Sequence, residues 1–115
     1  MKVIIAGSRT IWSPCPIRDA IRESGFAIHE VVSGTARGID QLGEMWAEKN
    51  RFPVRRFPAD WDGLGKRAGY VRNAQMAEYA DALIAVWDGK SKGTAHMIET
   101  MRKAGKNVFV HRVEV

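Results

Sequence analysis

Five short apolar runs, separated by segments with helical character, limit the folds open to this chain more than any other feature. The runs cover residues 3–6, 26–32, 54–57, 82–86 and 107–111. Residues 16–24, 36–49, 66–80 and 94–104 are predicted to be helices. Strands that alternate with helices are typical of a parallel sheet with helices on both faces, and continuous apolar strands agree with such burial. We therefore expect one doubly wound α/β domain over residues 1–115, with a mainly parallel five-stranded sheet.

The composition adds a basic charge balance. The formal net charge of +5 suits nucleic acid, nucleotides or other anions as partners, or serves only to keep the surface soluble. Cys15 is the one cysteine, so an internal disulfide is excluded, and one cysteine alone builds no metal site. No apolar run is long enough to span a membrane. We expect a protein of the reducing cytoplasm with no metal, no cofactor and no membrane partner.

Glycine-rich loops follow three of the predicted strands. Their sequences are GSRT (residues 7–10), SGTARG (33–38) and DGKSKGT (88–94). Glycine lets backbone N–H groups approach a phosphate, and the N-terminus of the next helix adds donors and a partial positive charge. In such folds ligands bind at the carboxyl edge of the sheet, which these loops share. The loops therefore predict an anion site, although they match neither GxGxxG nor GxxxxGK[ST], and ordinary turns also use glycine.

The predicted helix 66–80 carries two polar residues on its largely apolar side. Arg72 and Asn73 lie there among side chains such as Tyr70 and Met76. A charged residue on such a face needs a partner or a task. Arg72 therefore either contacts a ligand or pairs with a buried carboxylate for structural reasons.

Acidic and aromatic residues near the loops are further candidates. Asp40 and Asp60 either bind ribose hydroxyls or serve helix ends and turns. Trp61, like Trp12 and Trp87, either stacks on a base or packs at the edge of the core. The predicted ligand-binding residues are Gly7, Ser8, Arg9, Ser33, Gly34, Arg37, Asp40, Asp60, Arg72, Asn73, Asp88, Gly89, Lys90, Ser91, Gly93 and Thr94.

Four stretches of the sequence together resemble the SLOG superfamily, and within it the small single-domain YspA branch that is related to YpsA. They are IIAGSRT, VVSGTARGID, FPADWDGLGKRAGYVRNAQM and DGKSKGTAHMIETMRKAGKNVFV. The resemblance implies a Rossmann-like sheet whose loops bind a nucleotide-derived ligand, such as an ADP-ribose-type molecule or a cyclic nucleotide signal. It also implies a homo-oligomer, and a role in sensing or sequestering that signal in bacterial defence or in a phage.

Met97 is the main departure from the enzymes of this superfamily. Its phosphoribohydrolases combine an RxxxM motif with a PGGxGTxxE loop. Arg72 and Met76 keep the first motif, whereas Met97 stands at the position of the catalytic glutamate. Cleavage of a base–ribose bond needs such a carboxylate, so binding is favoured over catalysis. Two alternatives stay open: hydrolysis of an N-glycosidic bond with Asp40, Asp60 or Asp62 in place of the glutamate, and binding of single-stranded nucleic acid.

Overall fold

The computed structural model describes residues 1–114, in which strands and helices alternate along the chain. The elements are β1 (Lys2–Gly7), α1 (Cys15–Ser24), β2 (Glu30–Ser33), α2 (Ile39–Lys49), β3 (Val54–Arg56), α3 (Trp61–Leu64), the 3-10 helix η1 (Gly65–Arg67), α4 (Ala68–Tyr79), β4 (Ala82–Trp87), α5 (Lys92–Lys103) and β5 (Asn107–Arg112). Within this part of the chain, no helix combines the length and the apolar character that crossing a membrane requires.

All five strands are parallel and lie in the order β3-β2-β1-β4-β5, which confirms the predicted α/β fold. The strand order reverses beside β1, since β2 and β3 lie on one side of it and β4 and β5 on the other. Gly7, the last residue of β1, pairs with Val86 of β4. A crevice opens between the two strands at such a reversal, outside their carboxyl ends. The topology therefore places a crevice next to Gly7.

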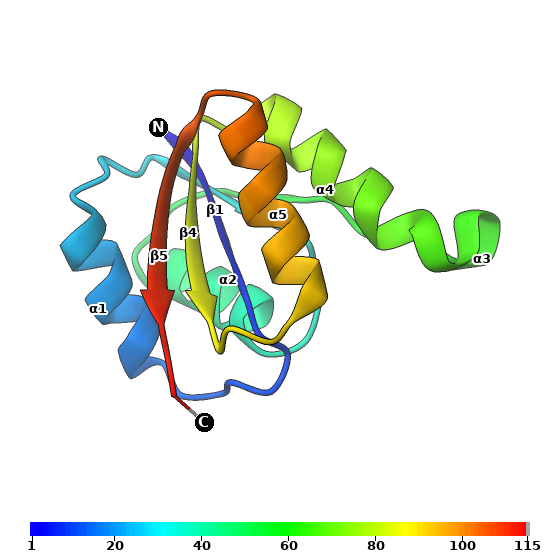
Figure 1. Ribbon diagram of the computed structural model, residues 1–115. Helices are drawn as coiled ribbons and strands as arrows, with labels where there is room; N and C mark the ends of the chain where they lie inside the picture. Colours follow the sequence, from blue (N-terminus) through cyan, green and yellow to red (C-terminus); the bar gives the residue numbers. More distant parts are fainter. Residues whose placement is uncertain (115) are drawn as a thin grey trace.

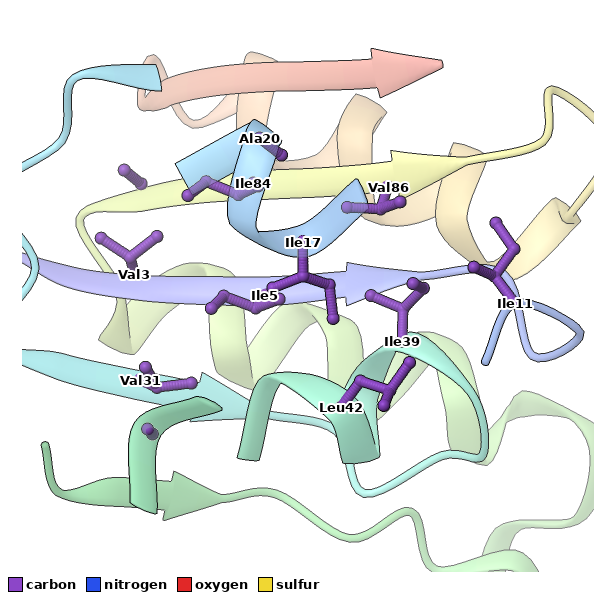
Figure 2. Close-up of a cluster of buried hydrophobic side chains, with 12 residues drawn as sticks. Val3, Ile5, Ile11, Ile17, Ala20, Val31, Ile39, Leu42, Ile84 and Val86 are labelled. Carbon is purple, nitrogen blue, oxygen red and sulfur yellow. The ribbon is translucent and has the colours of Figure 1, made fainter. Parts of the chain in front are cut away.

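Helices cover both faces of the sheet (Figure 1). On one face, Ile17 of α1 and Ile39 of α2 pack against strand residues such as Ile5 (Figure 2). On the other face, Met76 of α4 and Met97 of α5 belong to a second buried cluster, together with Ile4. Successive residues of a strand point to opposite faces, so a continuous apolar run supplies both clusters. This explains why the strands show no alternation of apolar and polar residues.

Several elements begin at residues other than those predicted; α2, for example, begins at Ile39 rather than at residue 36. For β2 and α5, a neighbour decides where the element starts. β2 begins at Glu30 rather than at residue 26, since Glu30 lies opposite Lys2, the first residue of β1. Before Glu30 the chain bonds instead to Met1, which precedes β1: the N–H of His29 donates to the Met1 carbonyl at 3.0 Å. α5 begins at Lys92 rather than at residue 94, since the Ser91 hydroxyl caps the helix by accepting a hydrogen bond from the N–H of Thr94 at 3.4 Å.

The connection after β3, predicted as a loop leading into a helix from residue 66, contains α3 and η1. Asp60 caps α3, since its Oδ1 accepts a hydrogen bond from the N–H of Gly63 at 2.9 Å. Gly65 follows with a φ of 62° and interrupts the helical path before α4. As a result α3 lies at the outer end of α4, away from the sheet (Figure 1).

Candidate functional site

A cavity of about 190 Å³ lies at the carboxyl edge of the sheet, beside the reversal of strand order. We call it the first compartment. Its walls come from the end of β1, the loops after β1, β2 and β4, the first turn of α2, the segment of α3 and η1, and the facing sides of α4 and α5. The lining residues are Ala6, Gly7, Arg9, Ala36, Asp40, Trp61, Lys66, Gly69, Tyr70, Arg72, Asn73, Met76, Ser91, Gly93, Thr94 and Met97.

Asp40, in the first turn of α2, is the acidic group of the first compartment. It is only 5% exposed, and its Oδ2 accepts a hydrogen bond from the N–H of Ala36 at 3.2 Å. Within residues 1–114, no Lys, Arg or His nitrogen lies within 4.0 Å of its carboxylate. Burial raises the pKa of Asp40 to about 6, against the opposing effects of the Ala36 N–H and the charge of Arg72. The first compartment therefore contains a carboxyl group that gains or loses its proton close to pH 6.

Arg72 of α4 lies across Gly34 from Asp40. A Cβ added to Gly34 would lie 2.7 Å from Arg72 Nη1 and 2.9 Å from Asp40 Oδ2, so a side chain at this position would displace one of them. Nη1 donates a hydrogen bond to the Gly34 carbonyl, while Nη2 donates to no protein acceptor in the described chain. Burial lowers the pKa of Arg72, partly offset by the charge of Asp40, yet a guanidinium stays protonated at neutral pH. Arg72 is thus a buried positive charge in a fixed position, and its Nη2 can donate a hydrogen bond to a ligand.

Asn73 links Arg72 to α5. Arg72 Nε donates to Asn73 Oδ1 at 3.1 Å, which leaves Nδ2 as the donor of the amide. Asn73 Nδ2 then donates to the Gly93 carbonyl at 3.2 Å and to His96 Nδ1 at 3.1 Å. His96 Nδ1 must be an acceptor there, so the imidazole is neutral with its proton on Nε2. Burial lowers the pKa of His96, in agreement with that state.

Two aromatic rings flank the first compartment. Trp61 is 51% exposed and Tyr70 is 49% exposed, which is unusual for such large side chains. The Trp61 ring packs over Gly69, where a Cβ would lie 3.3 Å from the ring. The Tyr70 ring packs on His96 with 4.4 Å between ring centroids, and the Arg9 guanidinium lies 6.0 Å from the Trp61 ring. Both rings offer flat surfaces on which a planar group can stack.

A second cavity, of about 290 Å³, adjoins the first. We call it the second compartment. It shares four walls with the first compartment, which are Arg9, Ala36, Trp61 and Arg72. Its other walls are Gly34, Thr35, Arg37, Pro58 and Ala59. The two cavities therefore form one continuous cleft with the Trp61 side chain beside their junction.

Most of the ligand-binding residues predicted from the sequence line this cleft. They are Gly7, Arg9, Gly34, Arg37, Asp40, Arg72, Asn73, Ser91, Gly93 and Thr94. Their segments lie far apart in the sequence, and the parallel topology brings them to one edge of the sheet.

The remaining predicted residues lie outside the walls and shape the loops. Ser8 Oγ accepts a hydrogen bond from the N–H of Asp88 at 3.0 Å, and Ser33 Oγ donates to Glu44 at 2.6 Å. Asp88 Oδ1 accepts hydrogen bonds from the N–H groups of Lys90 and Ser91. Gly89 takes a φ of 82° in the same turn, Lys90 is exposed, and Asp60 caps α3.

The binding residues predicted from the sequence do not include Lys66 and Tyr70, which line the first compartment. A signal for them exists, because Lys66, Tyr70 and Asn73 follow each other at intervals of four and three residues, and such residues share one face of a helix. Met97 also lines the cleft, and it is 1% exposed. Across residues 1–114, no group of three His, Cys, Asp or Glu side chains is placed to hold a metal ion.

Comparisons with known proteins agree with this fold and place the chain in a family. DNA processing protein A (DprA) from Streptococcus pneumoniae has a similar structure, with a TM-score of 0.75 and 20% identity over 95% of this chain and 49% of that protein. This chain thus spans about half the length of DprA. Gene 61 protein of Mycobacterium phage D29 is 35% identical over 116 aligned positions, which cover 90% of each chain. A sequence model of the YspA, cpYpsA-related SLOG family matches residues 1–63. The chain belongs to the YspA, cpYpsA-related SLOG family.

Proposed function

We propose that the cleft binds a nucleotide-derived small molecule through its phosphate. One observation carries this proposal: the buried guanidinium of Arg72, with Nη2 donating to no acceptor among residues 1–114, lines the same cavity as the first turn of α5. The first N–H groups of a helix lack partners within the helix and favour an anion. A phosphate placed between these two walls satisfies both.

The rest of the first compartment suits the other parts of a nucleotide. Lys66 and Arg9 add positive charge near the mouth, and neither has a carboxylate within 4.0 Å among residues 1–114. The Asp40 carboxylate accepts hydrogen bonds from ribose hydroxyls when it is ionised. Trp61 and Tyr70 stack on a base. We favour an ADP-ribose-type or cyclic nucleotide ligand, and a role in sensing or sequestering it in bacterial defence or in a phage.

Two exposed lysines provide a matched test. Lys66 lines the first compartment, whereas Lys49, at the end of α2, does not. Both substitutions to alanine remove one positive charge, so they have the same effect on any non-specific attraction of anions. Calorimetric titration with adenosine monophosphate (AMP) is expected to show weaker binding for Lys66→Ala and unchanged binding for Lys49→Ala. Equal losses in both variants, or no binding to the wild type, contradict the proposal.

Asp40 supports a second candidate function, the hydrolysis of an N-glycosidic bond. Its pKa of about 6 lets the carboxylate accept a proton from water near neutral pH, in a cavity where Met97 supplies no acid. Incubation with nucleoside monophosphates, followed by chromatography for free base, tests this candidate. Base release by the wild type that is lost in Asp40→Asn supports hydrolysis. No base release by the wild type contradicts hydrolysis and leaves binding as the only activity of the cleft.

Single-stranded nucleic acid is the remaining alternative to a small molecule. Binding of an oligonucleotide would fall steeply as salt rises, because each phosphate contact releases counterions. Fluorescence titration of an oligonucleotide at two salt concentrations distinguishes it from a mononucleotide. We also propose that the chain forms a homo-oligomer, and light scattering after size-exclusion chromatography measures its mass.

A further inference from the structure

We infer that the second compartment is a separate anion subsite, so that the ligand has two parts: a nucleotide in the first compartment and a second phosphate-bearing unit around Arg37. The two parts are joined beside Trp61. This inference rests on the proposed function, since it assigns the nucleotide to the first compartment. It adds a subsite, and among the ligands considered above it selects a nucleotide that is extended through its phosphate.

The charges of the two compartments differ. Arg9, Arg37 and Arg72 line the second compartment, and no carboxylate lines it. The first compartment, by contrast, includes Asp40 and apolar side chains such as Met76. Arg9 and Arg37 are exposed, and neither lies within 4.0 Å of a carboxylate among residues 1–114. Three guanidiniums around one cavity repel one another unless an anion lies between them, and arginine matches phosphate geometry well.

The loops that carry these arginines are held in fixed positions. Gly38 has a φ of 74°, and a Cβ there would lie 2.5 Å from the carbonyl oxygen of Ser8, so the loops after β1 and β2 touch backbone to backbone. The N–H of Ile39 also donates to that Ser8 oxygen at 3.3 Å. Arg9 and Arg37 each lie next to this contact in the sequence. The second compartment is therefore a built feature of the fold rather than a chance gap between loops.

The loop after β2 is anchored at its next residues as well. Thr35 has a φ of 63°, a conformation that is costly for a β-branched residue. Its N–H donates to Ser33 Oγ at 3.1 Å, and the N–H of Ala36 donates to Asp40 at 3.2 Å. These bonds hold the wall of the second compartment that Thr35 and Ala36 form. They also connect that wall to the acidic group of the first compartment.

The sizes of the cavities favour a ligand that occupies both. Ligand pockets in proteins usually measure about 300–1,000 Å³. The first compartment, at about 190 Å³, and the second, at about 290 Å³, each fall below that range, whereas together they lie within it. Because Arg9, Ala36, Trp61 and Arg72 border both cavities, one molecule can fill the two without crossing a protein wall.

Calorimetric titration with two probes tests the inference. AMP represents the one-part ligand, and diadenosine pyrophosphate, two adenosines joined through a pyrophosphate, represents the two-part ligand. The wild type is expected to bind the second probe more tightly. Arg37→Ala is expected to weaken its binding about tenfold, the effect of losing one charge-assisted hydrogen bond, and to change the binding of AMP less than twofold. Lys66→Ala is expected to weaken the binding of both probes.

Arg18 on α1 provides the control, because it is an exposed arginine that lines neither compartment. Arg18→Ala is expected to leave both affinities unchanged, which separates a local contact from a change in net charge. AMP binding together with Arg37-insensitive binding of diadenosine pyrophosphate overturns the two-part ligand and leaves the proposed function standing. Absence of AMP binding overturns the proposed function itself. A phosphorylated adenosine dinucleotide, pApA, that binds more tightly than diadenosine pyrophosphate assigns the site to a nucleic-acid strand and overturns the inference.

Discussion

The buried carboxyl of Asp40 makes the stability of the protein depend on pH in a defined direction. Its pKa is about 6 in the folded state, against an ordinary value of 3.8, because burial disfavours the charged form. Between these two values the folded state holds a proton that the unfolded state has lost, so stability falls as pH rises. The full difference is about 3 kcal/mol, and about 2 kcal/mol of it falls between pH 4.5 and 7.5.

Asp40→Asn removes this titration while keeping the size of the side chain. Its unfolding free energy relative to the wild type is therefore expected to increase by about 2 kcal/mol from pH 4.5 to pH 7.5, because only the wild type loses stability through Asp40. The amide changes the hydrogen bond from Ala36, but that contribution is the same at every pH and cancels from the pH dependence. His96, whose pKa is lowered by burial, destabilises both proteins as pH falls, so it cancels as well.

Urea denaturation of both proteins at pH 4.5, 5.5, 6.5 and 7.5 measures this difference. Wild-type and Asp40→Asn stabilities that run parallel across these pH values would refute the argument, because they would mean that Asp40 titrates alike in the folded and unfolded states.

Four further predictions concern single substitutions. Gly34→Ala adds a methyl group less than 3.0 Å from Arg72 and Asp40. It is expected to lower the free energy of unfolding by about 1–3 kcal/mol, measured by denaturation, and to weaken ligand binding, measured by calorimetry. A Cβ at Gly93 would meet no atom within 4 Å, so Gly93→Ala is expected to raise the free energy of unfolding by up to about 1 kcal/mol. Because Gly93 lines the cleft, the same substitution is expected to weaken phosphate binding, and unchanged affinity argues against a phosphate at α5. Lys106 donates to three carbonyls at the end of α4, so Lys106→Met is expected to cost about 1–3 kcal/mol, whereas Lys103→Met, which breaks a surface pair, is expected to cost at most about 0.5 kcal/mol. Trp61→Ala is expected to lose about 1–3 kcal/mol of binding free energy for a stacked base, with Trp61→Phe close to the wild type, and equal loss in both contradicts stacking.

The sequence predicts the architecture well because each part of it leaves a local signal. Continuous apolar runs and helical spacing identify the parallel sheet and its covering helices, and glycine after β1, β2 and β4 marks the edge where the cleft lies. The raised pKa of Asp40 leaves no such signal, because it depends on burial and on the distance to Arg72 across Gly34. These residues belong to different elements and meet only in the folded chain.

The second compartment is hidden from sequence reasoning for a related reason. Pro58 and Ala59 line it from the connection after β3, and nothing in their local pattern indicates that they face Arg37. The short helix α3, which sets the position of Trp61, depends on the Asp60 cap and on the bend at Gly65. Four-residue helices are too short to show a periodic pattern, so the sequence predicts this part of the site only as a loop.

The backbone contact at Gly38 has a consequence for redesign of the ligand preference. At Gly38 the loops after β1 and β2 touch without room for a methyl group. Many variants in a library that changes only one of these loops are therefore expected not to fold. Exchange with a relative should therefore transfer both segments as one cassette, residues 7–10 with residues 33–38. Surface-exposed α3 carries such a constraint at Gly63, where a Cβ would clash with the Asp60 carboxylate that caps the helix. Its other positions are exposed or half-buried, and variation there can alter what the cleft accepts at little cost in folding.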